Sequence, residues 1–178
     1  SQMMPTPLVQ INGRPNMDYL MDKISEISWI DEVLVCVNRR SEQQFKDWAI
    51  ARKHDKVKLL IENTVNGQGG LGAIATMAAA LPHLEEQDCL VVGGDNFFTS
   101  SLKGFLDFHY RTGATVVGVY VVAERGLSRR YSVVDIDREH RLMRFIEKPS
   151  RPDSNVVATC IYAMPYWTLS MVKDYLAE

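Results

Sequence analysis

The stretch Leu90-Val91-Val92-Gly93-Gly94-Asp95-Asn96 decides the fold class of this chain. Its apolar residues predict a buried strand, and the two glycines end that strand. Open α/β sheets bind their ligands at the carboxyl ends of strands, which is where Asp95 lies. An Asp at that place suits a divalent cation held against phosphate oxygens, the usual way in which proteins bind Mg²⁺. A second interpretation stays open, in which Asp95 caps the following helix.

Helical and strand patterns alternate on both sides of this stretch. Helices are predicted over residues 16–27, 41–53, 73–81 and 101–112, and strands over 32–37, 57–61, 88–92 and 114–123. This order predicts an α/β protein with a Rossmann-like, three-layer α/β/α arrangement around a mostly parallel sheet. After residue 124 the pattern changes, and it predicts an antiparallel hairpin of residues 131–137 and 142–148, a strand over 156–164 and a helix over 166–176.

The composition predicts a soluble globular protein. The chain has 178 residues, which fit one domain over residues 1–178, and 46% of them are hydrophobic. A net charge of −2 does not indicate nucleic-acid or membrane-surface binding. No apolar run approaches the roughly 20 residues that span a bilayer. Cys36, Cys89 and Cys160 lie far apart, which predicts free thiols in a reducing compartment and hence a cytoplasmic location. Monomer and homo-oligomer both stay open.

A glycine-rich segment from Asn66 to Ala73 lies between a predicted strand and a predicted helix. Backbone N–H groups in such a segment can face a phosphate or a nucleotide base. The segment lacks the Gly-Lys-Ser/Thr ending of a Walker loop, and no acidic residue follows at the spacing of a dinucleotide fingerprint. A flexible connector stays the alternative interpretation.

The tripeptide Glu147-Lys148-Pro149 ends the second arm of the predicted hairpin. Neighbouring residues of a strand point to opposite faces, so Glu147 and Lys148 share a site only where the backbone bends. Pro149 predicts such a bend or strand end. A carboxylate that accepts sugar hydroxyls and an ammonium that meets a phosphate suit a sugar-phosphate ligand. A solvated ion pair is the alternative.

In this order and spacing, the segments resemble the sugar-1-phosphate nucleotidyltransferase family, which includes the glucose-1-phosphate thymidylyltransferases. The matching stretches are residues 7–19, 67–73, 91–97, 131–134, 147–149 and 154–162. The resemblance implies a Mg²⁺-dependent reaction in which a nucleoside triphosphate and a sugar 1-phosphate give a nucleotide-sugar and pyrophosphate. The sugar phosphate oxygen attacks the α-phosphorus directly, so that catalysis needs alignment and charge neutralisation rather than a protein nucleophile.

The same resemblance implies roles for individual residues on the metal and sugar sides of the site. Asp95 would bind the metal and act in catalysis. Lys148 would meet the sugar phosphate as the second catalytic residue. Tyr131, Glu147 and Asn155 would line the sugar pocket.

On the nucleotide side, the resemblance implies a second set of substrate-binding residues. Gly67 would lie near the base or its ribose, and Gly70 would take that place in an alternative register. Glu62 stands where the family often has a Gln that reads the base. Gly94 would lie near the nucleotide, and Asn96 is included as a further substrate-binding residue.

Three positions depart from the family pattern: Thr6 stands for a Lys, and Ser132 and Cys160 stand for glycines. The Gly-x-Gly-Thr-Arg loop that grips the triphosphate and the second metal-binding Asp have no counterpart in the sequence. The domain is therefore expected to be incomplete at both ends, with little turnover by residues 1–178 alone. One alternative is a non-catalytic regulatory domain that binds nucleotide or sugar phosphate. A glycosyltransferase-like domain is disfavoured, because Asp95 is not part of an Asp-x-Asp motif.

Overall fold

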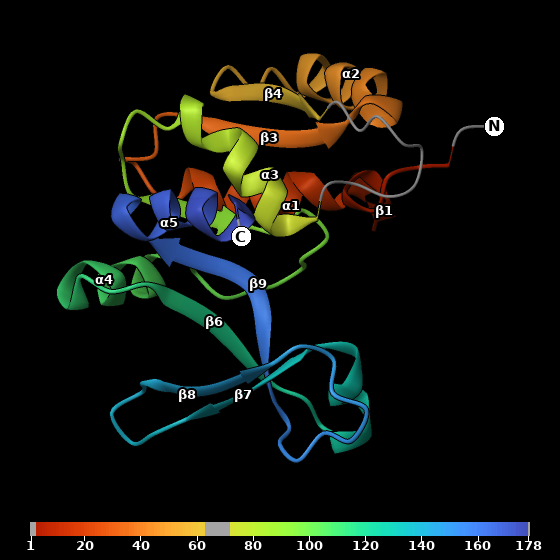
Figure 1. The fold of residues 1–178 in the computed structure, drawn as a ribbon. Coiled ribbons are helices and arrows are strands. Elements are labelled where there is room, and N and C mark those ends of the chain that lie inside the picture. The colour runs from red at the N-terminus through yellow and green to blue at the C-terminus, as the bar shows by residue number, and fades with distance from the viewer. Residues whose placement is uncertain (1–2, 63–71, 178) are drawn as a thin grey trace.

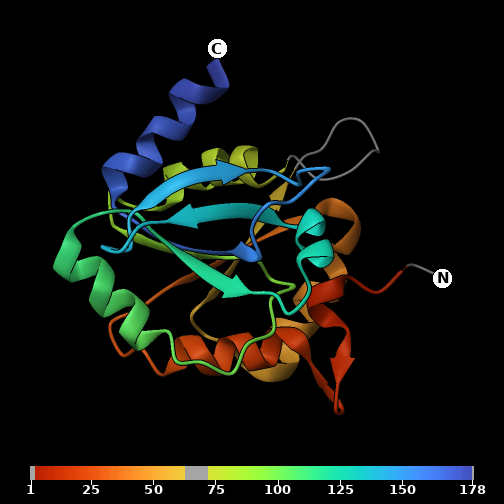
Figure 2. The same ribbon diagram turned by 90° about the horizontal axis from the view of Figure 1, so that it is seen from below.

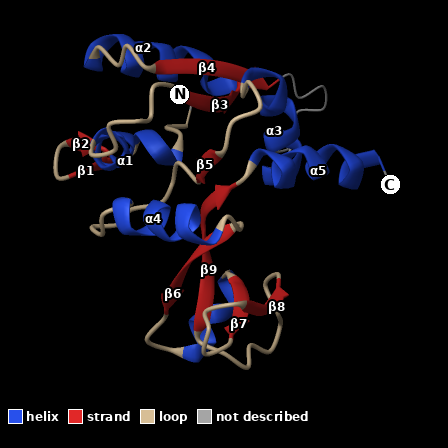
Figure 3. Cartoon of the chain, turned by 90° about the vertical axis from the view of Figure 1, so that its left-hand side faces the viewer, coloured by secondary structure: helices blue, strands red, loops and turns tan. Residues whose placement is uncertain are grey.

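The computed structural model describes residues 3–62 and 72–177, in which helices cover both faces of the strands. One helical layer contains α1 (Asn16–Ser25), α2 (Glu42–Arg52) and α4 (Lys103–Thr112). The other contains α3 (Ala73–Ala80) and α5 (Tyr166–Ala177). Figure 3 shows α1 and α4 on one side of the central strands and α3 and α5 on the other. The predicted three-layer α/β fold is confirmed.

The strands combine parallel and antiparallel pairing. β3 (Val33–Asn38) and β4 (Val57–Glu62) pair in parallel, as the alternation of elements predicts. β5 (Cys89–Val92) and β6 (Val116–Val121) both pair antiparallel with β9 (Val156–Met164), and the sequence pattern did not predict this direction. The predicted hairpin is confirmed as β7 (Ser132–Ile136) and β8 (Leu142–Ile146), which Figure 2 shows from below.

β9 joins the hairpin to the main body of the molecule. Its second half, from Ile161 to Met164, pairs with β5. Its first half pairs with the start of β7, where Ala158 lies opposite Ser132 and Val157 opposite Val133. In Figure 1, β9 runs from the hairpin up to the helical layers. β9 therefore belongs both to the sheet of the main body and to the hairpin.

Short elements complete the chain and connect the longer ones. A two-stranded ribbon is made of β1 (Gln10–Ile11) and β2 (Arg14–Pro15), which the sequence pattern did not predict. The 3-10 helices are η1 (Thr6–Leu8), η2 (Arg39–Ser41), η3 (Leu81–His83) and η4 (Arg125–Arg130).

The hydrophobic core lies on both sides of the strands. Under α1 and α2, the buried cluster includes Met17, Leu20, Val35, Phe45 and Trp48. A second cluster, which includes Ile27, Leu106 and Ala163, lies under α4, and a third, of Leu81, Met164 and Leu169, lies under α5. The apolar stripes of the helices face these clusters, which fixes each helix against the sheet.

The buried carboxylate of Asp18 ties α1 to α2. It accepts a hydrogen bond from Trp48 Nε1 at 2.8 Å and forms an ion pair with Arg52, whose Nη2 lies 2.9 Å from the other carboxylate oxygen. We expect Asp18→Ala to lower the free energy of unfolding by about 2 to 3 kcal/mol, because a buried donor loses its partner. Urea denaturation followed by tryptophan fluorescence measures this change.

A matched control for Asp18 is Asp22→Ala, also on α1, which removes an exposed ion pair with Arg14 of β2. We expect only a small change in stability there, because solvent screens exposed pairs. Equal losses for Asp18→Ala and Asp22→Ala would contradict the role given to the buried carboxylate.

No helix in residues 3–62 and 72–177 is long and apolar enough to cross a membrane.

The three cysteines are free thiols, as predicted. Burial raises the pKa of Cys36 to about 11, to which the charge of Glu62 adds, and burial likewise raises the pKa of Cys89 to about 11.

Candidate active site

Asp95 lies at the tip of a tight turn directly after β5. The backbone N–H of Asn96 donates to the carbonyl of Gly93 at 3.0 Å, which closes the turn around Gly94 and Asp95. The Asp95 side chain is exposed, and the described residues make no hydrogen bond or ion pair with its carboxylate. The turn thus presents a free carboxylate at the carboxyl end of a half-buried strand.

The structure decides against the helix-cap interpretation of Asp95. The next helix, α4, begins at Lys103, and the backbone N–H of Lys103 donates to Ser101 Oγ at 3.2 Å. Asp95 lies too far from that helix to cap it. Its carboxylate is therefore available to a ligand.

Gly94 lies against the N-terminal segment of the chain. A Cβ atom on Gly94 would come within 3.1 Å of Pro7 Cγ and 4.0 Å of Met17 Sδ. A side chain at position 94 would push Pro7 away by a few tenths of an ångström, so this close approach favours glycine. The Asp95 turn is therefore packed directly onto η1 and α1.

Glu147 and Lys148 lie on one side of the backbone, as a shared site requires. Lys148 has a φ of +42°, in the left-handed region that non-glycine residues rarely adopt. This bend follows the end of β8, and it brings Lys148 Nζ within 3.2 Å of Glu147 Oε1. Both side chains remain largely exposed, so that the pair is accessible to a ligand.

Ser132 and Tyr131 hold this corner from the neighbouring strand. The Ser132 hydroxyl donates to Glu147 Oε2, and the carbonyl of Tyr131 accepts the backbone N–H of Lys148 at 3.2 Å. The hydrogen bond from Ser132 holds the pKa of Glu147 below its ordinary value, against burial, which raises it, and the contact with Lys148 lowers it further. The replacement of a family glycine by Ser132 therefore adds a hydrogen bond to the candidate sugar-binding acid.

β9 lies beside both the Asp95 turn and the corner that contains Glu147, and two of its side chains respond to their charges. Cys160 and Tyr162 are two residues apart and share one face of this strand. Burial raises the pKa of Cys160, and the charge of Asp95 raises it further, against the Gly93 backbone N–H, which lowers it. Burial also raises the pKa of Tyr162, and the charges of Cys160 and Glu147 raise it further.

Hydrogen bonds and strand pairing give the same placement: the Cys160 carbonyl accepts the Gly93 backbone N–H at 2.6 Å. Ala158 lies opposite Ser132, whose hydroxyl bonds to Glu147. The Asp95 turn and the Glu147–Lys148 corner therefore adjoin the same segment of β9, in which no role for Tyr162 was predicted from the sequence.

The amide side chains of Asn96 and Asn155 bond to the protein backbone. Asn96 Nδ2 donates to the carbonyls of Gly93 at 3.1 Å and Cys160 at 3.3 Å. Asn155 Nδ2 donates to the carbonyl of Val122 at 3.2 Å. Both amides hold strand ends together, and their direct contact with a substrate stays a prediction.

Glu62 ends β4, at the carboxyl edge of the parallel pair. Its side chain is buried and accepts a hydrogen bond from the hydroxyl of Thr76 in α3. The carboxylate therefore fixes α3 to the sheet, and its role in reading a base stays a prediction. Gly67 and Gly70 lie outside the described residues.

The chemistry of the site suits a metal ion that arrives with phosphate ligands. In the described part of the chain, no group of three or more His, Cys, Asp or Glu residues is arranged to hold a metal. Mg²⁺ in phosphate-transfer sites keeps several waters and uses one or two carboxylates together with substrate phosphates. The exposed, unpaired carboxylate of Asp95 fits that ligand set.

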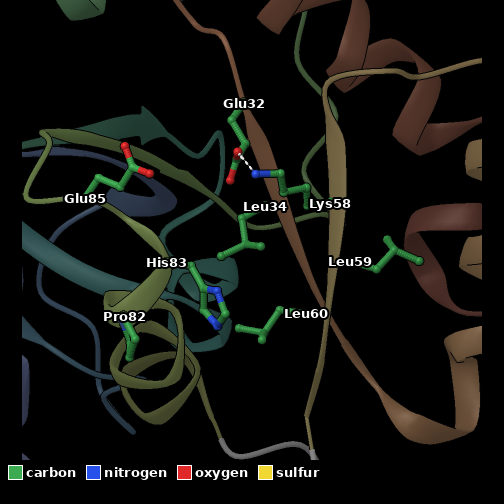
Figure 4. Close-up of a pocket in the computed structure, with 8 residues that line it drawn as sticks. All are labelled: Glu32, Leu34, Lys58, Leu59, Leu60, Pro82, His83 and Glu85. Atoms are coloured by element: carbon green, nitrogen blue, oxygen red, sulfur yellow. Dashed lines mark ion pairs between the residues drawn. The ribbon is translucent and has the colours of Figure 1, made fainter.

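A cavity of about 320 Å³ lies elsewhere, at the amino ends of β3 and β4 (Figure 4). Its walls include Leu34, Leu60 and His83, and an ion pair between Glu32 and Lys58 crosses its rim. Asp95 and Glu147 do not line it. The cavity lies at the amino ends of its strands, whereas the sheets of α/β proteins bind ligands outside the carboxyl ends, so the Asp95 turn after β5 is the better candidate.

A family model described as "Nucleotidyl transferase" matches residues 1–178. The chain belongs to this nucleotidyl transferase family, and the resemblance inferred from the sequence is confirmed. The mannose-1-phosphate guanylyltransferase catalytic subunit beta of Drosophila melanogaster is 25% identical over 158 residues, or 89% of this chain and 42% of the relative. The glucose-1-phosphate adenylyltransferase of Thermotoga neapolitana is 28% identical over 134 residues, or 71% of this chain and 31% of the relative. The chain spans less than half the length of these two relatives.

Solved structures show the same fold. A protein of Bacillus anthracis assigned as a glucose-1-phosphate thymidylyltransferase, in complex with a sucrose, has a TM-score of 0.81 at 15% identity, with 95% of this chain and 66% of that chain covered. An apo UDP-glucose pyrophosphorylase has a TM-score of 0.76 at 13% identity, with 96% and 72% covered. These likenesses confirm the Rossmann-like α/β architecture.

Proposed function

We propose that this chain forms the catalytic core of an enzyme that transfers a nucleotidyl group from a nucleoside triphosphate to a sugar 1-phosphate. The products are a nucleotide-sugar and pyrophosphate, as in a glucose-1-phosphate thymidylyltransferase. The observation that supports the proposal is the position of β9, which bonds to Gly93 of the Asp95 turn through Cys160. The same strand pairs through Ala158 with Ser132, whose hydroxyl bonds to Glu147. In this proposal, Asp95 and Glu147, from distant parts of the sequence, share one site.

In this proposal, the hairpin binds the sugar 1-phosphate. Glu147 accepts hydrogen bonds from sugar hydroxyls, because its lowered pKa keeps it ionised near neutral pH. Lys148 neutralises the sugar phosphate, with its ammonium held 3.2 Å from Glu147 Oε1. The backbone carbonyl of Tyr131 accepts the Lys148 N–H, and the exposed Tyr131 ring is available to the sugar.

The nucleoside triphosphate would lie beside Gly94 and Asp95. Asp95 would hold Mg²⁺, which when bound offsets the negative charge of the two phosphorylated substrates. An oxygen of the sugar phosphate forms a bond to the α-phosphorus while the bond from that phosphorus to the β-phosphate bridging oxygen breaks. Pyrophosphate leaves with that electron pair. The residues of this chain contribute alignment and electrostatic stabilisation, and no covalent protein intermediate is needed.

A pyrophosphate-release screen tests the proposal. The intact polypeptide that carries this chain is incubated with each common nucleoside triphosphate against a set of sugar 1-phosphates. We expect release only when a nucleoside triphosphate, a sugar 1-phosphate and Mg²⁺ are all present. Saturable nucleotide binding without release for any pair would instead support a regulatory domain of the same fold. The proposed location of the enzyme is the cytoplasm, since all three thiols are free.

A further inference from the structure

We propose that Asn16 is a positioning residue, which fixes the Asp95 turn so that its carboxylate points toward the metal. This inference rests on the proposed function, because it assumes that Asp95 binds the ion. It concerns a side chain that lies 78 residues before Gly94 and 80 residues before Asn96 in the sequence. Asn16 falls within the matching stretch of residues 7–19, but no role was predicted for it from the sequence.

The Asn16 amide bonds to both sides of Asp95. Its Nδ2 donates to the carbonyl of Gly94 at 3.2 Å and to the carbonyl of Asn96 at 3.1 Å. These two carbonyls belong to the residues that directly precede and follow Asp95. One planar amide therefore holds the Gly94–Asp95 peptide group directly before Asp95 and the Asn96–Phe97 peptide group just beyond it, which restricts the backbone on both sides of Asp95.

Asn16 is itself rigidly held. It is the first residue of α1 and is 4% exposed, and its backbone N–H donates to the carbonyl of Val9 at 2.9 Å. The next residue, Met17, belongs to the buried cluster under α1. Asn16 is thus anchored in the core rather than in a loop, which is what precise positioning of a ligand requires.

The turn is held from its other side by Asn96, whose amide bonds to Gly93 and to Cys160 on β9. Asn16 and Asn96 together fix the turn between α1 and β9, while the Asp95 carboxylate remains free. Groups that orient a metal ligand without touching the metal commonly control its affinity. The arrangement around Asp95 has this form.

The identity of residue 16 is explained by its two donor bonds. Asn16 Oδ1 is buried and has no hydrogen-bond partner among the described residues, which costs free energy. A Leu of similar size would avoid that cost but would leave the carbonyls of Gly94 and Asn96 without their donor. Retention of a buried amide here is consistent with a requirement for a fixed turn.

A double-mutant cycle tests whether Asn16 acts through Asp95. The readout is Mn²⁺ binding, measured by electron paramagnetic resonance, to the intact polypeptide saturated with the nucleoside triphosphate from the screen. We expect Asn16→Leu to weaken Mn²⁺ binding about 10-fold in the wild-type background. In the Asp95→Asn background we expect Asn16→Leu to cause no further weakening, because the positioned carboxylate is gone.

The control is Asp18→Asn, on the same helix two residues further on, which weakens the hydrogen bond from Trp48 and removes the ion pair with Arg52. We expect it to lower the melting temperature while Mn²⁺ affinity stays within about twofold, since additivity holds for sites without shared partners. If Asn16→Leu does not fold, Asn16→Ser replaces it, because a short hydroxyl cannot reach both carbonyls.

The outcomes separate the two proposals. An unchanged Mn²⁺ affinity in Asp95→Asn alone would remove the metal role of Asp95 and with it the proposed function. A large effect of Asp95→Asn, combined with no effect of Asn16→Leu or with an undiminished effect in the double mutant, would overturn the positioning role of Asn16 only.

Discussion

Asp95→Asn is expected to lower kcat for pyrophosphate release by about 10²- to 10³-fold, the range seen when one electrostatic contact to a transition state is lost. The amide keeps the shape of the side chain but removes the negative charge that would hold Mg²⁺. Folding should survive, because the described residues make no hydrogen bond or ion pair with this carboxylate and it is exposed. Steady-state kinetics at saturating substrates, with the melting temperature measured in parallel, check both statements.

The matched control is Asp107→Asn, an equal change of charge at an exposed position of α4. We expect it to leave kcat within about twofold, because exposed charges are screened by salt. Undiminished turnover in Asp95→Asn, or a similar loss in both variants, would show that Asp95 does not hold the metal.

Lys148→Met is expected to raise KM for the sugar 1-phosphate by about 10- to 100-fold, since a hydrogen bond to a charged group contributes about 1.5 to 3 kcal/mol. KM for the nucleoside triphosphate should change little, because Lys148 belongs to the hairpin side of the site. The effect should decrease at high ionic strength, as both partners are solvent-exposed. Initial rates with each substrate varied in turn measure these constants.

The control for Lys148 is Lys103→Met, at the exposed start of α4. It changes the net charge equally and should leave both KM values unaltered. A rise in KM for the nucleoside triphosphate alone in Lys148→Met would assign Lys148 to the other substrate.

The sequence predicted individual elements well because each has its own local pattern. The strand expected over residues 156–164 is observed as Val156–Met164, and the helix expected from residue 16 begins at Asn16. Pro149 correctly indicated a bend that places Glu147 and Lys148 on one side. The direction of β9 was not predicted, since a buried strand has the same apolar pattern in parallel and antiparallel sheets.

The site was predictable only in part. Asp95 and Glu147 stand out because each is an acidic residue close behind a strand pattern, Glu147 directly after it and Asp95 after two glycines. The contacts of Asn16 could not be predicted from the sequence, because hydrogen bonds to backbone carbonyls 78 and 80 residues away leave no local pattern. The same holds for Asn96 and Asn155, whose amides turn toward backbone carbonyls.

The position of β9 also limits how this architecture can vary through evolution. Removal of one residue from β9 would reverse which side chains point to each side, and Cys160 and Tyr162 would leave the site together. Insertions between β7 and β8 face no such constraint, because the turn there lies at the surface. Natural length variation among close homologues should therefore gather in the β7–β8 turn and spare the nine residues of β9.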